Sequence, residues 1–277
     1  MRKLCYLVVE GPHDVEFSCR IIKSKTNLTR IRMVDELDEV FRSLVPDKFP
    51  HSGDLLKRVP VPVFFQNGTS AVAVHAAGGD SKIADCIAGT LDIITADQFS
   101  AIGVVLDSDS DKSPAERHRK LLELTKDLPV KFPGTPGNVL KGSPSSGVFV
   151  LPDNSSMGTL EDLLIECGKA VYPGQITKAE TFVADAFAIC PSKDFKDLHS
   201  PSGRNKAIVG SVAGLLRPGK AVQVSIQDNA WLSDLGLQIP RVGAFADFLV
   251  ELFEFNTTTV IAPTTASPTP QNGTVTK

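Results

Sequence analysis

The sequence predicts an α/β protein, built on a mostly parallel sheet that helices cover on both faces. Short and almost continuously apolar segments, which are typical of buried parallel strands, occur at residues 4–9, 101–106 and 147–152. An amphipathic segment follows each of them, and this alternation is typical of a sheet between two helical layers. The 277 residues, of which 42% are hydrophobic, are enough to bury a substantial core.

The elements between the first two of these strands are expected to form an insertion. A helix is predicted near residues 13–25, and residues 34–45 again carry apolar side chains at helical spacing. Asn67-Gly68 is a strong hairpin signal and separates two further apolar strands. The sequence therefore predicts an inserted helix and hairpin at about residues 28–75.

Three more helices are predicted from spacing and from turn residues. The first follows Gly78-Gly79 and has apolar residues at positions 83, 87, 91 and 94, and the second lies near residues 114–127. The third begins within residues 159–168. Between the last two, residues 129–146 form a long loop rich in Pro, Gly and Ser.

The C-terminal third of the chain is expected to be helical. From about residue 176 helical patterns dominate, and a tail at residues 256–277, rich in Thr and Pro, is predicted to be disordered. We therefore expect a catalytic core at residues 1–175 and a helical extension at residues 176–255 that packs on it. An apolar stripe marks the last helix of this extension: Phe245, Phe248, Leu249, Leu252 and Phe253.

Composition indicates a protein of a reducing cytoplasm. The five cysteines are dispersed and include no C-x-x-C pair, which argues against a disulfide framework and a zinc knuckle. No signal peptide is visible at the N-terminus, and no apolar stretch approaches the roughly 18 residues of a membrane span. The net charge of −3 does not indicate a nucleic-acid binder, and the basic run at residues 117–120 is interpreted as a solvated helix face.

Acidic residues follow two of the predicted buried strands. Glu10 ends the first strand, and Asp107 ends the strand at residues 101–106. Ligands of open α/β sheets bind beyond the carboxyl ends of the strands, so the two acids share one crevice if their strands are neighbours. Asp109 and Asp111 continue with a spacing of two, and an extended stretch would turn them to the same side as Asp107.

Two further acids are expected at this crevice. Asp14 lies about one helical turn after Glu10, and Glu161 would stand at the mouth, whereas Asp162 fits a capping box with Thr159. Crowded carboxylates raise one another's pKa, and Mg²⁺ or Mn²⁺ would remove their repulsion. Each acid alone also fits a surface turn or a helix N-terminus. Their coincidence at two strand ends favours a metal site.

The arrangement resembles a known domain. A strand followed by Glu-Gly, a helix and a later strand ending in Asp-x-Asp-x-Asp is similar to the TOPRIM domain of topoisomerases, bacterial primases, recombination proteins and OLD-type nucleases. The segments VEGPHD (9–14), GGDSKI (78–83) and GTLEDLL (158–164) most resemble small stand-alone TOPRIM proteins related to OLD nucleases, some of which belong to phage-defence operons. The resemblance covers roughly residues 4–170. The chain departs from the pattern in the insertion at 28–75 and in lacking a fused ATPase domain, which suggests a separate ATPase partner.

This resemblance implies a metal-dependent nuclease that uses two ions of Mg²⁺ or Mn²⁺. Glu10 would bind metal or act as general base, Asp107 would hold metal, and OLD-like nucleases also use a basic residue. Lys206, with Arg204 as its neighbour, is the residue we select for that role. The predicted metal ligands are Glu10, Asp14, Asp107, Asp109, Asp111 and Glu161.

Two other functions remain open at this point. The segment VVLDSDSD also resembles the nucleophile motif of haloacid dehalogenases, in which Asp107 would be phosphorylated and Glu10 would have no role. Alternatively, the acids bind Mg²⁺ for structure in a non-catalytic subunit, and the helix near residues 243–255 docks an ATPase or toxin partner. The sequence does not decide between DNA and RNA as the nucleic-acid partner, and it is compatible with a homo-oligomer.

Overall fold

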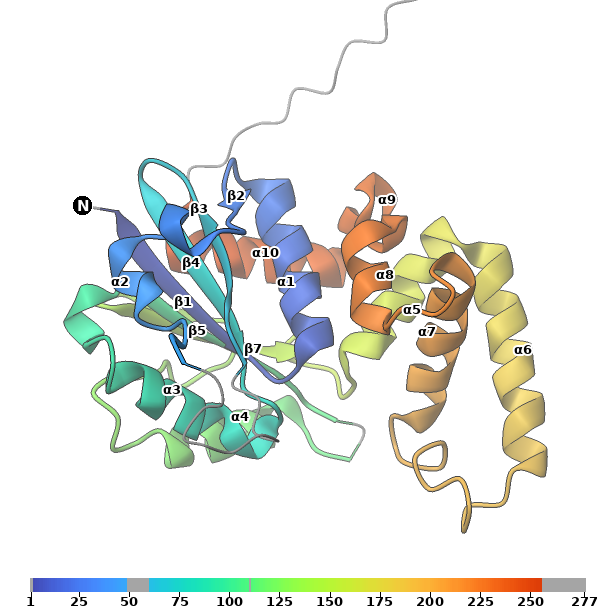
Figure 1. Ribbon diagram of the computed structural model, residues 1–277. Helices are drawn as coiled ribbons and strands as arrows, with labels where there is room; N and C mark the ends of the chain where they lie inside the picture. Colours follow the sequence, from blue (N-terminus) through green and yellow to red (C-terminus); the bar gives the residue numbers. More distant parts are fainter. Residues whose placement is uncertain (1, 49–59, 110, 256–277) are drawn as a thin grey trace, which may run out of the picture.

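A mixed sheet lies at the centre of the computed structural model, which describes residues 2–48, 60–109 and 111–255 (Figure 1). In the described residues the sheet has seven strands in the order β2-β3-β4-β1-β5-β7-β6. Helices cover both faces, as predicted for an α/β fold. The strands are β1 (Lys3–Val9), β2 (Thr29–Arg30), β3 (Val63–Gln66), β4 (Ser70–Ala76), β5 (Ala101–Asp107), β6 (Val139–Leu140) and β7 (Ser145–Leu151).

The prediction of a mostly parallel sheet holds only for its centre. β4, β1, β5 and β7 run parallel to one another. The pairs β2–β3, β3–β4 and β6–β7 are antiparallel. The cause at one edge is the hairpin at Asn67-Gly68, because a tight turn returns the chain antiparallel to its preceding strand. The sheet is therefore mixed, with antiparallel strands at both edges.

The two faces of the sheet are covered by different helices (Figure 1). Alternate residues of β1 show this: Cys5, Leu7 and Val9 join a core with α1, α5 and α10, whereas Tyr6 and Val8 join a second core with α2 and α3. The helices are α1 (Pro12–Lys25), α2 (Glu39–Arg42), α3 (Ile83–Leu91), α4 (Pro114–Leu124), α5 (Leu160–Val171), α6 (Pro173–Ile189), α7 (Gly203–Leu216), α8 (Val222–Asp228), α9 (Asp234–Leu237) and α10 (Pro240–Phe253). Short 3-10 turns lie at Val34–Glu36, Asp80–Lys82, Ala96–Gln98 and Ala230–Leu232.

The predicted helix at residues 34–45 is broken into two short pieces. A 3-10 turn at Val34–Glu36 is followed by the single turn of α2. The break lies at Asp38, whose carboxylate accepts a hydrogen bond from the Val40 backbone N–H and so starts a new helix. The tail predicted to be disordered, residues 256–277, lies outside the described residues.

The C-terminal helices belong to the core of the sheet. All five apolar residues of the predicted stripe in α10 are buried, and they pack in one hydrophobic cluster with residues of β1, β5 and β7. The stripe is therefore core packing, which removes the docking surface that the non-catalytic alternative required. No helix in the described residues is long and apolar enough to cross a membrane.

We predict that α10 tolerates no added volume beneath it. A Cβ atom at Gly103 of β5 would stand 2.7 Å from Leu252 and 2.8 Å from Leu7. Gly103→Ala should therefore lower the free energy of unfolding by about 1–3 kcal/mol, measured by urea denaturation. Gly243→Ala in α10 is the matched control, because nothing lies within 4 Å of the added Cβ. This control should gain up to about 1 kcal/mol, and an unchanged Gly103→Ala would contradict the close packing.

Candidate metal centre

The carboxyl ends of β1 and β5 lie side by side and bring two of the predicted acids together. The strands are parallel neighbours, with Val9 paired to Val105. Glu10 follows β1 directly, and its Oε1 accepts a hydrogen bond of 3.0 Å from the backbone N–H of Asp107. The two strands are therefore neighbours, which was the condition for Glu10 and Asp107 to share one crevice.

Four carboxylates and one lysine line a single pocket of about 450 Å³ at this edge of the sheet. The acids come from three separate parts of the chain: the β1–α1 junction, the end of β5 and the start of α5. Gly78 and Gly79, which follow β4, form part of its wall. The five charged residues are Glu10, Asp14, Asp107, Glu161 and Lys206.

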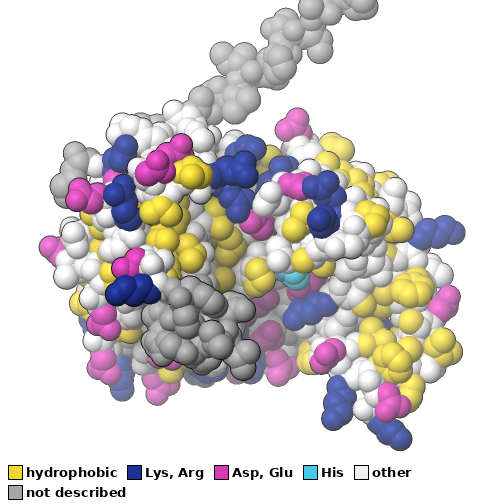
Figure 2. Space-filling view, in the orientation of Figure 1, with side chains coloured by type: hydrophobic (Ala, Val, Ile, Leu, Met, Phe, Trp, Pro, Cys, Tyr) yellow, Lys and Arg dark blue, Asp and Glu magenta, His cyan; other side chains and the backbone are white. Residues whose placement is uncertain are grey.

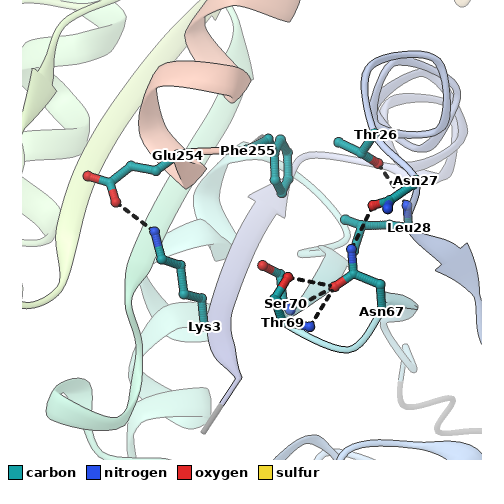
Figure 3. Close-up of a pocket in the computed structure, with 9 residues that line it drawn as sticks. All are labelled: Lys3, Thr26, Asn27, Leu28, Asn67, Thr69, Ser70, Glu254 and Phe255. Carbon is teal, nitrogen blue, oxygen red and sulfur yellow. Dashed lines mark hydrogen bonds and ion pairs between the residues drawn. The ribbon is translucent and has the colours of Figure 1, made fainter. Parts of the chain in front are cut away.

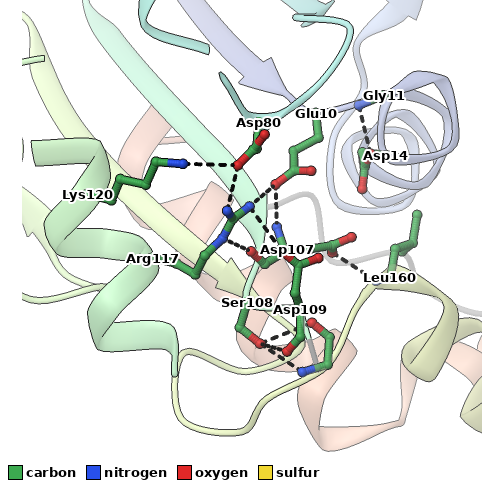
Figure 4. A network of polar contacts seen from close by, with 11 residues as sticks. Glu10, Gly11, Asp14, Asp80, Asp107, Ser108, Asp109, Arg117, Lys120 and Leu160 are labelled. Carbon is green, nitrogen blue, oxygen red and sulfur yellow. Dashed lines mark hydrogen bonds and ion pairs between the residues drawn. The ribbon is translucent and has the colours of Figure 1, made fainter. Parts of the chain in front are cut away.

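Helix N-termini hold the acids that follow the strands. Asp14 lies in the first turn of α1 and accepts a hydrogen bond of 2.9 Å from Gly11 N–H. The backbone N–H of Leu160, the first residue of α5, donates to Asp107 Oδ1 at 2.9 Å (Figure 4). Both contacts place a carboxylate at the positive end of a helix dipole. The helices thereby fix the direction in which these side chains point.

The two acids at the start of α5 have different roles: Asp162 caps the helix, and Glu161 lines the pocket. Asp162 accepts from the backbone N–H of Thr159 at 2.8 Å and so forms the predicted capping box. Glu161 is buried and lines the pocket, where the Thr159 hydroxyl donates to its Oε2 at 2.8 Å. His13, at the start of α1, lies 3.8 Å from the other carboxylate oxygen of Glu161.

Crowding and burial shift the pKa values of these acids. Burial, with the nearby charge of Asp14, raises the pKa of Glu10 to about 7. Burial raises the pKa of Asp14 to about 6, although the hydrogen bond from Gly11 acts to lower it. Burial and the negative charges of the other three acids raise the pKa of Asp107 well above its usual value. Burial alone would raise the pKa of Glu161, but the interactions with His13, Thr159 and Lys206 lower it below its usual value. In the absence of a cation, the pocket therefore favours the protonated form of Glu10, Asp14 and Asp107, but not of Glu161.

Of the two basic residues considered, only one faces the acids. Lys206, in α7, lines the pocket, and its charge contributes to the lowered pKa of Glu161. Arg204 instead lies over the Phe187 ring, with 3.6 Å between the guanidinium carbon and the ring centroid. Figure 2 shows a hollow between the sheet and the α6–α7 hairpin, with charged side chains along it. Lys206 is thus the better-placed candidate.

Two predicted ligands do not join the pocket. Asp109 has a φ of 64° and forms an isolated bridge with Gly158, so the extended alternation after Asp107 ends there. Its carboxylate points toward Arg117, 3.7 Å from Nη2, and Asp111 is exposed. The expectation that the three aspartates turn to the same side is therefore wrong for Asp109, because its positive φ interrupts the extended conformation that a spacing of two requires.

Arg117 is the site residue that the sequence analysis missed. The interpretation of residues 117–120 as a solvated face is wrong for its first half, since Arg117 and His118 are each only 3% exposed. Arg117 Nε donates to the carbonyl of Asp107 at 2.9 Å, and Nη2 lies 3.0 Å from Glu10 Oε1 (Figure 4). The available signal was helical spacing, because positions 117 and 118 share a face with Pro114 and Leu121.

The donor set fits Mg²⁺ or Mn²⁺, although it is not arranged around an ion. Among the described residues, no three Asp, Glu, His or Cys side chains already stand as a metal site. The pocket nevertheless offers carboxylate oxygens, which hard divalent cations prefer. Oε2 of Glu10 and Oδ2 of Asp107 accept no hydrogen bond from the described residues, so both remain for a ligand.

A second pocket, of about 300 Å³, lies at the opposite end of β1 and differs in its charges (Figure 3). Its polar groups largely partner one another: Asn67 donates to Asn27 at 2.7 Å, and Lys3 pairs with Glu254 at 2.8 Å. No carboxylates crowd together in this pocket. The pocket at the other end of the sheet, where four carboxylates outnumber one lysine, is therefore the stronger candidate for a ligand site.

We predict that the metal-free protein loses stability as the pH rises. The unfolded chain ionises Glu10 near pH 4.5 and Asp14 near pH 3.8, whereas the folded protein does so near pH 7 and 6. Between these values the folded state holds more protons, so the free energy of unfolding falls with rising pH. Urea unfolding in EDTA should show a loss on the order of 1–3 kcal/mol from about pH 5 to about pH 8.

The control for this prediction is a pair of glutamine variants. Glu10→Gln cannot ionise and should show a smaller loss than the wild type over the same pH range. Glu123→Gln, at an exposed position of α4, should keep the full loss. Equal losses in Glu10→Gln and the wild type would contradict the role of Glu10.

Comparison with known proteins places the chain in a family. A hypothetical protein from Pyrococcus horikoshii OT3, known from a crystal structure, is 16% identical over 91% of this chain and 95% of that chain, with a TM-score of 0.49. No curated protein matches the chain. The model of a family described as "Protein of unknown function (DUF3226)" matches residues 5–254. Since this match spans most of its length, the chain belongs to the DUF3226 family.

Proposed function

We propose that this protein is a nuclease that hydrolyses phosphodiester bonds with the help of Mg²⁺ or Mn²⁺. The observation that carries the proposal is the convergence of Glu10, Asp107 and Lys206, with two further acids, on one pocket. Hydrolysis of a phosphodiester needs an activated water and positive charge near the phosphate oxygens. Oxygen ligands beside a lysine are a combination that can supply both.

Each side chain has a distinct role in this proposal. Bound Mg²⁺ or Mn²⁺ would acidify a water and neutralise charge on the phosphate. Asp107, Asp14 and Glu161 would hold the cation, and the Lys206 ammonium group would bind a phosphate oxygen. Glu10 would accept a proton from that water, since its Oε2 accepts no hydrogen bond from the described residues.

The remaining parts of the proposal concern partners. The substrate is DNA or RNA, and the resemblance to stand-alone TOPRIM proteins supports an effector of phage defence that works with a separate ATPase in the cytoplasm. The haloacid-dehalogenase alternative leaves Glu10 without a role, although Glu10 accepts a hydrogen bond from the backbone of Asp107. We therefore retain the nuclease as the single proposal.

We predict cleavage of at least one of plasmid, single-stranded DNA and tRNA in the presence of Mg²⁺ or Mn²⁺, and none in EDTA. Glu10→Gln and Asp107→Asn should each lower the rate about a hundredfold or more, because they remove the proton acceptor or a ligand oxygen. Product release is followed on gels with a labelled substrate. A preparation that cleaves at the wild-type rate after both substitutions contains a contaminating nuclease, and the proposal fails.

The lysine is tested by a matched pair of variants in the same helix. Lys206→Met should lower the rate about a hundredfold, since it removes a cation from the pocket. Arg204→Met, two residues earlier, removes a cation that lies on Phe187 outside the pocket, and it should change the rate severalfold at most. The reverse order of effects would assign the phosphate contact to Arg204 instead.

A further inference from the structure

A buried guanidinium group occupies the side of Glu10 that faces α4. Arg117 Nη2 lies 3.0 Å from Glu10 Oε1, and Nη1 lies 2.6 Å from Asp80 Oδ2. The carboxylate of Asp109 is 3.7 Å from Nη2, and Nε donates to the carbonyl oxygen of Asp107. One cation thus contacts three carboxylates and a carbonyl within the acidic cluster (Figure 4).

Glu10 stands between this guanidinium and the pocket. Its Oε1 takes the contacts with Arg117 and with the Asp107 N–H, whereas Oε2 accepts no hydrogen bond from the described residues. Asp109 is turned to Arg117 and does not line the pocket. The acidic cluster therefore has two sides, one neutralised by Arg117 and one that faces the pocket with Asp14, Asp107 and Glu161.

The contacts of Arg117 disfavour a second divalent ion on its side of the cluster. An arginine stays charged at all relevant pH values, and this one is only 3% exposed and held by several partners at once. Removing it from these partners would leave its own charge buried and unpaired, which costs several kcal/mol. A dication beside it would in addition be repelled by the guanidinium charge.

We propose that the pocket holds a single divalent cation and that Arg117 serves as a fixed second cation. This inference rests on the proposed metal-dependent function, and it replaces one of the two ions expected from the resemblance. Arg117 is a positioning residue in this arrangement: it fixes Oε1 of Glu10 and leaves Oε2 toward the pocket. The count of bound ions tests the proposal directly, because a merely structural arginine would not determine that count.

The experiment counts Mn²⁺ ions bound to the full chain near pH 7.5. Free Mn²⁺ is measured by electron paramagnetic resonance during titration, so the readout does not depend on nuclease activity. The wild type should bind one ion per chain, and Asp107→Asn should lower the affinity for that ion about tenfold or more. Arg117→Met should allow a second ion to bind, because it removes the guanidinium charge from beside Glu10 and Asp109.

Two variants serve as matched controls. Arg117→Lys keeps a positive charge at the position and should still bind one ion. Lys120→Met removes another cation of α4, which lies 3.5 Å from the same oxygen of Asp80 and forms no hydrogen bond or ion pair with Glu10 in the described residues. It should also bind one ion. Circular dichroism confirms that each variant is folded before its ions are counted.

The outcomes separate this inference from the proposed function. Two ions bound by the wild type would overturn the role of Arg117 and leave a metal-dependent nuclease intact. Folded Arg117→Met that binds only one ion would also overturn it. If Arg117→Met does not fold, the wild-type and Arg117→Lys counts decide. A wild type that binds no Mn²⁺ at millimolar concentration would instead defeat the proposed function itself.

Discussion

The parallel pairing of β1 with β5 is the constraint on which the candidate site depends. It sets Val9 beside Val105, so the residues that follow each strand meet at one edge of the sheet. The contact between Glu10 and the backbone of Asp107 is a direct consequence. Because both strands are buried on both faces, neither can slide without exposing apolar residues to water or burying polar ones. The rigidity of the core thereby holds acids together that would otherwise repel.

Charge balance explains how such a cluster is tolerated. Buried carboxylates are costly unless a cation or hydrogen-bond donors compensate for them. Arg117 compensates on the α4 side, and the N-termini of α1 and α5 contribute backbone donors to Asp14 and Asp107. On the side that faces the pocket, the basic side chains among the described lining residues are Lys206, which is exposed, and His13 beside Glu161. The raised pKa values of Glu10 and Asp14 show that burial and charge repulsion of these carboxylates are not fully offset there.

Local patterns in the sequence predicted the elements but not their assembly. Continuous apolar runs located β1, β5 and β7, and Asn67-Gly68 located the hairpin between β3 and β4. The antiparallel pairs β2–β3 and β6–β7 were missed because strand order depends on contacts between distant segments, which periodicity does not record. Asp109 was misplaced for a different reason: spacing of two assumes an extended chain, and its positive φ breaks that assumption. Arg117 was missed because a basic run is usually solvated, and only its place on the apolar face of α4 shows otherwise.

The site also depends on the C-terminal half of the chain, and α7 and α10 lie beyond residues 4–170, the segment that resembles TOPRIM domains. The start of α5 supplies Glu161 and the N–H group that holds Asp107, and α7 supplies Lys206. α10 then returns to the sheet and packs so closely on β5 that Gly103 leaves no room for a methyl group. The strand that carries Asp107 is therefore supported by a helix whose sequence follows it by more than a hundred residues. A core and a helical extension can be drawn along the sequence, but in the fold they share one hydrophobic cluster, and the acids are positioned by both.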